Sequence, residues 1–386
     1  MGDQGRAAKR VGTLSNTSNY YLELTGGKTR GVLAGLQRGG LWLLSITYGI
    51  GVRIRNWMFA RGWKKSARVP VPVVSVGNLT LGGTGKTPCV EYIADFYRKR
   101  GVRPVILSRG YGGMGDVGGR NDEAMVLEEN LPDVPHLLGP DRAILAQTAI
   151  EELESELVIL DDGFQHRRLK RDLDVLLIDC TNPWGHGYLF PRGWLREPVS
   201  SLKRAGVVLL TRCDQVKSNE RHRIIERIRR IHHDCPVAES SHAPMELVNA
   251  RGETRPLEYL SGKTTAAFCG LGNPGGFRRT LEDLGGRVVE FRSYPDHHQY
   301  TRADVDELRN WARQQAADCL VLTTQKDLVK LRLERLDNRE LWAVRIRLQV
   351  ESGAEMLERK LVEIAGPKSR NHKWESRRGI KDDQAL

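Results

Sequence analysis

Short apolar runs rich in β-branched residues alternate with stretches of helical periodicity along the chain from residue 70 onward. The stretch 86–100 places Val90, Ile93, Ala94 and Tyr97 on one face, at the i, i+3, i+4, i+7 spacing of an amphipathic helix. Nearly continuous apolar strands joined by helices are typical of a parallel sheet covered on both faces. We predict strands at 71–76, 104–108, 157–160, 173–179 and 206–211, and a second helix at 142–153.

A second series of apolar runs follows an irregular polar stretch. A helix at 303–317 is predicted there because Thr301 and Asp304 have the spacing of a capping box. The predicted strands of this series lie at 264–269, 287–291, 318–323 and 341–346. The two series predict an α/β protein with two α/β/α domains, 69–240 and a smaller 262–365, and the catalytic cleft between them.

The segment before the first predicted domain is apolar and then strongly basic. Residues 41–52 carry no charge over twelve positions, and residues 53–68 carry six cations and no acid. A membrane span needs about 20 apolar residues, so the pattern favours a helix lying in the membrane interface beside anionic lipids. A buried amphipathic helix is the alternative. We predict a membrane-associated helix and basic segment at 36–68, and mobile polar tails at 1–35 and 366–386.

The overall composition limits the class of protein. A net charge of +12 on 386 residues is compatible with nucleic-acid binding, but no nucleic-acid recognition motif is present. The six cysteines are scattered with no pair at metal-ligand spacing, which predicts buried thiols in a reducing cytoplasm. The first forty residues are polar and glycine-rich, so no secretory signal is predicted.

The stretch 71–87 has the pattern of a strand, a glycine-rich turn and the start of a helix. Glycines in such a turn let backbone N–H groups converge on phosphate oxygens, and the lysine and threonine that follow serve the β- and γ-phosphates and Mg²⁺. The usual G-x-x-x-x-G-K-[ST] pattern is broken only at its first position, where Thr80 stands. We predict a P-loop-type sheet that binds ATP and Mg²⁺. The predicted nucleotide-binding residues are Thr80, Leu81, Gly82, Gly83, Thr84, Gly85, Lys86 and Thr87.

A P-loop needs an acid at the end of a neighbouring apolar strand. Asp161 and Asp162 follow the predicted strand at 157–160. At the carboxyl end of a central parallel strand they would face the phosphates and hold Mg²⁺, directly or through water. The alternative is that the two carboxylates only cap the next turn. We predict that both act with Thr87 as metal ligands.

Seven motifs follow one another along the chain. They are 76–88 (Val-Gly-Asn-Leu-Thr-Leu-Gly-Gly-Thr-Gly-Lys-Thr-Pro), 108–111 (Ser-Arg-Gly-Tyr), 161–166 (Asp-Asp-Gly-Phe-Gln-His), 192–198 (Arg-Gly-Trp-Leu-Arg-Glu-Pro), 270–274 (Gly-Leu-Gly-Asn-Pro), 295–297 (Pro-Asp-His) and 324–327 (Thr-Gln-Lys-Asp). In these motifs the chain resembles the tetraacyldisaccharide 4′-kinase family over roughly residues 38–365. An ordered and dispersed series of this kind is far more specific than a P-loop alone.

The resemblance implies a reaction and a location. It implies transfer of the γ-phosphate of ATP to the 4′-hydroxyl of tetraacyldisaccharide 1-phosphate, a lipid A precursor, to give lipid IVA. It also implies attachment to the cytoplasmic face of the bacterial inner membrane through an N-terminal apolar helix, which agrees with the pattern of residues 41–68. The implied partners are the acylated disaccharide lipid and an anionic membrane surface, with no nucleic acid and no obligate protein partner.

The resemblance further implies roles for single residues. Asp122 matches the acid of a family motif that acts as catalytic base, and His297 matches the histidine that pairs with it. A sugar hydroxyl is a poor nucleophile, and a carboxylate oriented by a histidine can accept its proton as the phosphoryl group arrives. Lys86 is the third implied catalytic residue. Other matched positions near the metal or the phosphates are Asn78, His166, Arg196 and, as a metal ligand, Glu197.

Other interpretations of the motifs were compared with this one. Residues 270–275 formally match a dinucleotide-binding fingerprint, but Pro274 and the existing nucleotide loop disfavour it. Residues 210–214 resemble a guanine-reading motif, but Arg212 replaces its lysine, so we predict the end of a core strand followed by a turn. The main alternative function is a membrane-attached P-loop switch that hydrolyses nucleotide without phosphorylating a lipid. Departures from the family's usual residues, as at His186, leave the acyl pattern of the substrate open.

Overall fold

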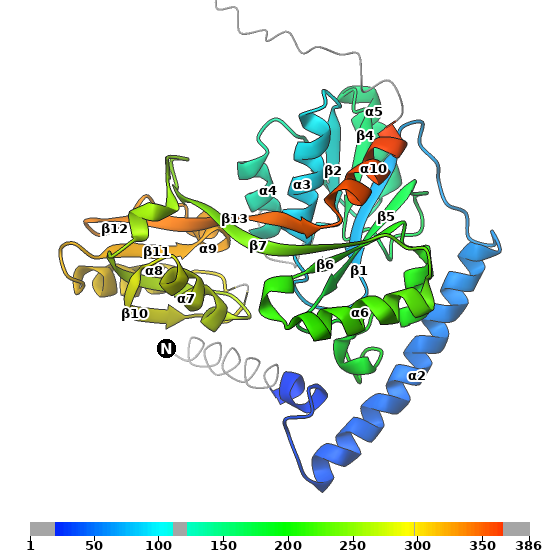
Figure 1. Cartoon of the computed structure of the whole chain (residues 1–386), viewed down its shortest axis with the longest axis horizontal. Coiled ribbons are helices and arrows are strands. Elements are labelled where there is room, and N and C mark those ends of the chain that lie inside the picture. Colours follow the sequence, from blue (N-terminus) through cyan, green and yellow to red (C-terminus); the bar gives the residue numbers. More distant parts are fainter. Residues whose placement is uncertain (1–19, 111–121, 297, 366–386) are drawn as a thin grey trace, which may run out of the picture.

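The computed structural model describes residues 20–110, 122–296 and 298–365. The first half of the chain forms a parallel sheet (Figure 1). In spatial order its strands are β3 (His136–Leu138), β2 (Pro104–Ser108), β4 (Leu157–Asp161), β1 (Val73–Asn78), β5 (Leu173–Asp179) and β6 (Val207–Thr211). The predicted ranges 104–108 and 173–179 are confirmed, and β1 lies two residues further along than predicted.

Alternate residues of the central strands pack into cores on opposite faces of the sheet, as the two-residue period of a strand requires. Val74 and Val76 of β1 pack on the face covered by α3 (Lys86–Arg98) and α4 (Asp122–Asn130). Val73 packs on the other face with α5 (Arg142–Glu152). That second face is completed by α6 (Ser218–Ile231) and the short helix η2 (Val199–Arg204). The prediction of a parallel sheet covered on both faces is confirmed.

The second half of the chain adds three more parallel strands and three helices. The strands are β10 (Arg287–Ser293), β9 (Thr264–Cys269) and β11 (Leu320–Thr324), and the helices are α7 (Pro274–Asp283), α8 (Arg302–Arg313) and α9 (Gln325–Leu331). Thr301 and Asp304 form the predicted capping box at the start of α8. Shorter elements are η1 (Gly185–Gly187), η3 (Cys213–Gln215), η4 (Leu257–Leu260), β8 (Thr254–Arg255) and β12 (Arg335–Leu336).

A long antiparallel ribbon joins the two halves into one sheet. It consists of β7 (Val237–Asn249) and β13 (Arg339–Ser352), and β7 also pairs with β6 while β13 pairs with β11. The chain then returns to the first half as α10 (Ala354–Ala365), whose Leu357 and Leu361 are buried against α3. We predicted that the second domain would include residues up to 365. In the structure the apolar residues of α10 pack into the core of the P-loop half, and the domain boundary itself stays a prediction.

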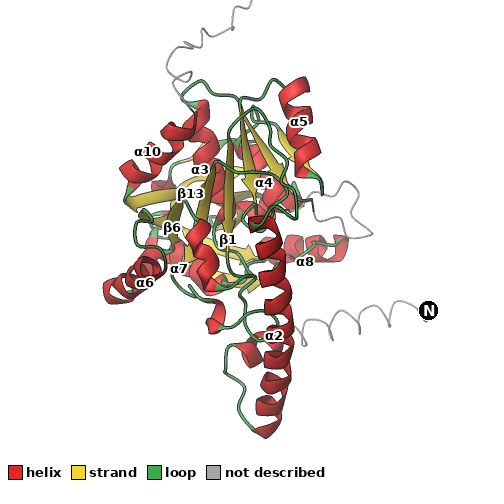
Figure 2. Cartoon of the chain, turned by 90° about the vertical axis from the view of Figure 1, so that its right-hand side faces the viewer, coloured by secondary structure: helices red, strands yellow, loops and turns green. Residues whose placement is uncertain are grey.

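The apolar N-terminal segment forms α2 (Val32–Ala60), a helix of 29 residues that runs along the body and extends beyond it (Figure 2). Its buried residues are Ala34, Ser45, Gly49 and Val52. Large apolar side chains on its other faces are exposed, among them Leu36, Leu43, Ile50, Ile54 and Trp57. The alternative of a buried amphipathic helix is therefore wrong. Within the described residues, no helix combines the length and the apolar character needed to cross a membrane.

The segment before α2 differs from the predicted mobile tail. Residues 1–19 and 366–386 lie outside the described residues, but residues 20–25 are helical. Leu24 and Thr25 are buried, and the hydroxyl of Tyr21 donates to the carbonyl of Pro191 at 2.6 Å. These contacts anchor the end of the predicted tail to the loop that contains the Arg-Gly-Trp motif.

Candidate active site

The predicted P-loop connects β1 to α3. Gly82 and Gly85 have φ angles of 99° and 84°, in the left-handed region that glycine adopts without steric cost. The loop is held from one side by the segment 194–196, because the amide of Leu81 donates to the carbonyl of Trp194 at 2.7 Å. Asn78 fixes the start of the loop by donating to the carbonyl of Thr80 at 2.8 Å. The sequence therefore builds a strand, loop and helix in the arrangement that cradles phosphates.

Asp161 and Asp162 stand where β4 ends, beside the P-loop strand. Lys86 Nζ lies 3.6 Å from Asp162 Oδ1, and Arg196 donates to both oxygens of Asp162 at 2.9 and 2.8 Å. Burial alone would raise the pKa of Asp162, but the charges of Lys86 and Arg196 outweigh it and lower the pKa. Asp162 is therefore ionised between Lys86 and Arg196, whose contact with phosphate stays a prediction.

Asp161 has the opposite electrostatic environment. It is 8% exposed, and burial together with the nearby carboxylate of Glu123 raises its pKa to about 6. Ser108 Oγ donates to Asp161 Oδ2 at 3.0 Å. Its other oxygen, Oδ1, is buried and has no hydrogen-bond partner among the described residues. A buried carboxylate oxygen of this kind fits a hard cation such as Mg²⁺, with Thr87 and Asp162 as the other predicted ligands.

Asp122 begins α4 at the contact between the two halves of the molecule. It is 8% exposed, and Lys330 Nζ of α9 lies 3.8 Å from its Oδ2. Lys330 also donates to the carbonyl of His298 at 3.1 Å, which brings the segment after Pro295 close to α4. His297 lies outside the described residues, so its pairing with Asp122 stays a prediction.

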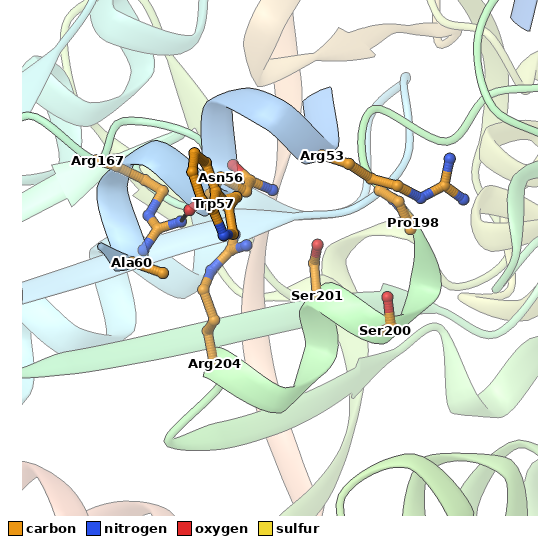
Figure 3. Close-up of a pocket in the computed structure, with 9 residues that line it drawn as sticks. All are labelled: Arg53, Asn56, Trp57, Ala60, Arg167, Pro198, Ser200, Ser201 and Arg204. Atoms are coloured by element: carbon orange, nitrogen blue, oxygen red, sulfur yellow. Dashed lines mark hydrogen bonds between the residues drawn. The ribbon is translucent and has the colours of Figure 1, made fainter. Parts of the chain in front are cut away.

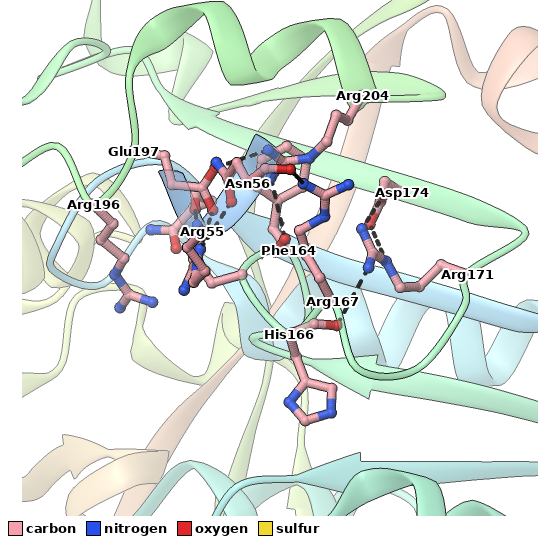
Figure 4. A network of polar contacts seen from close by, with 12 residues as sticks. Arg55, Asn56, Phe164, His166, Arg167, Arg171, Asp174, Arg196, Glu197 and Arg204 are labelled. Carbon is pink, nitrogen blue, oxygen red and sulfur yellow. Dashed lines mark hydrogen bonds and ion pairs between the residues drawn. The ribbon is translucent and has the colours of Figure 1, made fainter. Parts of the chain in front are cut away.

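Neighbouring residues in the Arg-Gly-Trp motif point to different partners (Figure 4). Arg196 reaches Asp162, whereas the fully buried Glu197 accepts from Arg55 at 3.1 Å and Arg204 at 2.8 Å. Burial would raise the pKa of Glu197, but hydrogen bonds and charge from Arg204 lower it. We predicted a metal ligand at Glu197, and that role stays a prediction. In the structure its carboxylate connects α2 to the P-loop half, because both of its oxygens are held by side chains around it.

The other predicted contacts lie around the same loop. Burial and the charge of Arg142 lower the pKa of His166 to about 4, so its ring is neutral near pH 7. Its Nε2 is buried and lacks a hydrogen-bond partner among the residues described, as does Oδ1 of Asn78. Both side chains therefore keep a polar atom available for a bound group. Their contact with substrate or phosphate stays a prediction.

Comparison with known proteins agrees with this geometry. Residues 38–364 match the family model described as tetraacyldisaccharide-1-P 4′-kinase. The chain belongs to the tetraacyldisaccharide 4′-kinase family. A tetraacyldisaccharide 4′-kinase of Syntrophus aciditrophicus is 39% identical over 321 residues, covering 75% of this chain and 83% of that protein. A tetraacyldisaccharide 4′-kinase of Anaeromyxobacter dehalogenans strain 2CP-C is 41% identical over 350 residues, covering 85% of this chain and 91% of that protein.

A solved structure of the same family is similar over most of its length. The crystal structure of LpxK from Aquifex aeolicus in complex with ATP matches with a TM-score of 0.69 and 32% identity, covering 85% of this chain and 99% of that one. The similarity therefore extends to both halves of the fold and is not confined to the P-loop.

Two residues that brace the P-loop were not predicted from the sequence. Arg212 follows β6, donates to the carbonyl of Gly83 at 2.7 Å and forms an ion pair with Asp179. His242 of β7 packs so closely on the loop that a Cβ added to Gly85 would lie 2.4 Å from its Nε2. The place of Arg212 at a strand's carboxyl end was a usable signal. No local pattern marks His242, because only the sheet topology brings β7 to the loop.

Proposed function

We propose that this chain transfers the γ-phosphate of ATP to the 4′-hydroxyl of tetraacyldisaccharide 1-phosphate, giving lipid IVA in lipid A biosynthesis. The proposal rests chiefly on the family match over residues 38–364, which includes the P-loop. In that loop Lys86 lies beside Asp162 at the end of β4. A switch that only hydrolyses nucleotide would need no acid at Asp122, on the helix that faces the second half of the fold.

The proposed transfer uses the charges described above. The acceptor oxygen bonds to the γ-phosphorus as the bond from that phosphorus to the β–γ bridging oxygen breaks, and ADP leaves. P-loop amides, Lys86 and Arg196 stabilise the negative charge on the phosphoryl oxygens. Thr87, Asp161 and Asp162 would hold Mg²⁺, which when bound neutralises phosphate charge.

Asp122 is the proposed general base. Its carboxylate takes the proton of the 4′-hydroxyl during the attack, and His297 orients it or shares the resulting charge. Lys330 Nζ lies 3.8 Å from Asp122 Oδ2 and 3.2 Å from Asp327 Oδ1, so Asp122 has a cationic neighbour that it shares with Asp327. Because Lys330 belongs to α9 and Asp122 to α4, the base is supported by both halves of the molecule.

The proposed location is the cytoplasmic face of the bacterial inner membrane. The exposed apolar side chains of α2 would lie among lipid chains, and the cations after residue 52 would meet anionic headgroups. The acceptor is itself a membrane lipid, so an interfacial helix would bring the active site to its substrate.

The direct test is incubation with γ-labelled ATP and a panel of disaccharide lipids that differ in acylation and in the 1-phosphate. The expected result is label on the 4′-position of tetraacyldisaccharide 1-phosphate, and none with the Lys86→Ala variant. ATP turnover that proceeds at full rate without any lipid acceptor would contradict the proposal and favour the P-loop switch.

A further inference from the structure

A pocket of about 390 Å³ lies between the C-terminal part of α2 and helix η2, outside the nucleotide site (Figure 3). Arg53 and Trp57 of α2 line it on one side, and Ser200 and Arg204 of η2 on the other. Arg167, from the loop after β4, lies beside Trp57. Arg53 and Trp57 belong to the segment proposed to meet the membrane, and no residue of this pocket was given a role in the proposed reaction.

The pocket carries an excess of positive charge. Arg53, Arg167 and Arg204 line it, and the only carboxylate in their hydrogen-bonded network within the described residues is Glu197, which Arg55 shares. Arg53 has no ion pair among the residues that the structure describes. Burial, followed by the charges of Arg204 and Arg171, lowers the pKa of Arg167, as expected for cations held close together without enough counter-charge.

The guanidinium groups are held in place by buried contacts. Arg204 donates to Glu197 at 2.8 Å and to the carbonyl of Phe164 at 3.3 Å, and its cation lies 4.3 Å from the centre of the Phe164 ring. Arg167 donates to the carbonyl of Asn56 at 2.9 Å. The Nε–H of Arg204 is buried and unpartnered within the described part of the chain. A fixed arginine with a spare donor is suited to an oxyanion.

We propose that this pocket binds the phosphate group of a lipid. Its place on the molecule favours a lipid, since the apolar residues Ile50 and Ile54 of α2 are exposed next to it and Trp57 forms one of its walls. The phosphate has two possible sources. One is the 1-phosphate of the acceptor, which rests on the proposed function, and the other is the headgroup of an anionic phospholipid.

The positions of Arg196 and Glu197 agree with the 1-phosphate of the acceptor as the bound group. Arg196 extends to Asp162 in the nucleotide site, and the adjacent Glu197 extends to Arg204 in the pocket wall. Two adjacent residues of one short segment therefore reach the phosphoryl-transfer site and the wall of the pocket, respectively. A headgroup that places one end at the first site would bring its other end towards the second.

The test compares a pocket variant with a matched surface variant. Arg53→Gln combined with Ser200→Asp changes the pocket lining, and Lys203→Gln combined with Ser218→Asp makes the same charge change on exposed neighbouring surface. Equal thermal midpoints would show that both variants fold. One arm measures KM for tetraacyldisaccharide 1-phosphate and for the same disaccharide without its 1-phosphate. The other arm measures binding to phosphatidylcholine vesicles with and without phosphatidylglycerol.

Loss of a charge-assisted contact to phosphate is expected to weaken binding about tenfold. A tenfold rise in KM for the 1-phosphate acceptor alone, with KM for ATP unchanged, supports the acceptor source. A tenfold loss of phosphatidylglycerol-dependent vesicle binding supports the phospholipid source. Pocket and control variants that behave alike in both arms would overturn the proposal. If wild-type protein labels no disaccharide, the proposed function fails, and the vesicle arm still tests the pocket.

Discussion

Asp161 and Asp162 are adjacent in the chain, yet the fold shifts the pKa values of their carboxyls in opposite directions. Asp161 is buried near Glu123 and its pKa rises to about 6, whereas Asp162 lies between Lys86 and Arg196 and its pKa falls. The site thus holds one carboxylate that is ionised at any physiological pH and one that protonates just below neutrality.

This asymmetry predicts a pH dependence of Mg²⁺ binding. A metal ligand must lose its proton, so apparent Mg²⁺ affinity should fall about tenfold per pH unit below pH 6 and level off above it.

In metal-free protein, folding stability should depend on pH in the opposite direction, because the raised pKa of Asp161 stabilises the folded state at low pH. That contribution is full below the unfolded value near 4 and is lost as pH rises through about 6. Calorimetric Mg²⁺ titrations with ATP, and thermal midpoints of wild type and Asp161→Asn, measure both effects. Metal affinity that is flat between pH 5 and 7 would contradict the assignment.

Lys86→Ala should reduce phosphoryl transfer to less than about a tenth of the wild-type rate, since its cation neutralises phosphate charge in the transition state. Little stability should be lost, because Arg196 still pairs with Asp162. Lys99→Ala, at the exposed end of the same helix, is the matched control. Initial rates measure the loss of transfer in both variants, and thermal midpoints measure any loss of stability. Substantial activity in Lys86→Ala would exclude the P-loop assignment.

Asp122 and His297 should behave as one catalytic unit. Loss of a general base typically costs about 10² to 10⁴ in rate, so Asp122→Ala and His297→Ala should each lower kcat strongly with little change in ATP affinity. The double variant should be hardly worse than the poorer single variant. Asp283→Ala, elsewhere on the second half, serves as control. Strictly multiplicative losses would leave Asp122 as the base and give His297 a separate contact.

Glu197→Gln should lower the free energy of unfolding by about 3 kcal/mol, because Arg55 and Arg204 lose the buried carboxylate they share. Glu282→Gln breaks an exposed pair with Arg278 and should cost less than about 1 kcal/mol. Urea unfolding gives both values. The Mg²⁺ requirement should stay unchanged in Glu197→Gln, and a tenfold increase would restore the metal role that the sequence predicted.

Replacing Leu36, Leu43 and Ile50 of α2 with glutamine should reduce partition to anionic vesicles at least about a hundredfold, given about 1.5–3 kcal/mol for each buried side chain. The matched control places glutamine at three exposed apolar positions elsewhere, Ile144, Leu153 and Val289. Sedimentation with vesicles measures partition, and equal loss in both variants would count against the interfacial helix. Deleting residues 1–52 is a coarser test, because Tyr48 donates to the carbonyl of Arg196 beside the active site.

The sequence predicted most of what depends on local pattern. The strands 104–108, 173–179 and 264–269 were placed correctly because each is a short apolar run between turn signals. The P-loop was recognised because the residues that form it are consecutive in the sequence. Only part of the ribbon was predicted: the strand expected at 341–346 lies within β13, whereas β7 was missed, since it contains polar residues and Pro244 and has an irregular register with β13. The contacts of Arg212 with the P-loop and the burial of Glu197 arise from tertiary structure that no local sequence pattern indicates.

The return of α10 to the first half has a consequence for how the protein is made. The hydroxyl of Tyr97 in α3 donates to the carbonyl of Leu361, 264 residues later, and Leu357 and Leu361 fill the same core. A ribosome releases the nucleotide-binding half long before it has synthesised the helix that covers it. Until then the apolar face of α3 stays open, and such nascent chains are prone to aggregate and to need chaperones. A chain stopped a few residues before α10 would therefore contain every catalytic motif and still lack a closed core around its nucleotide site.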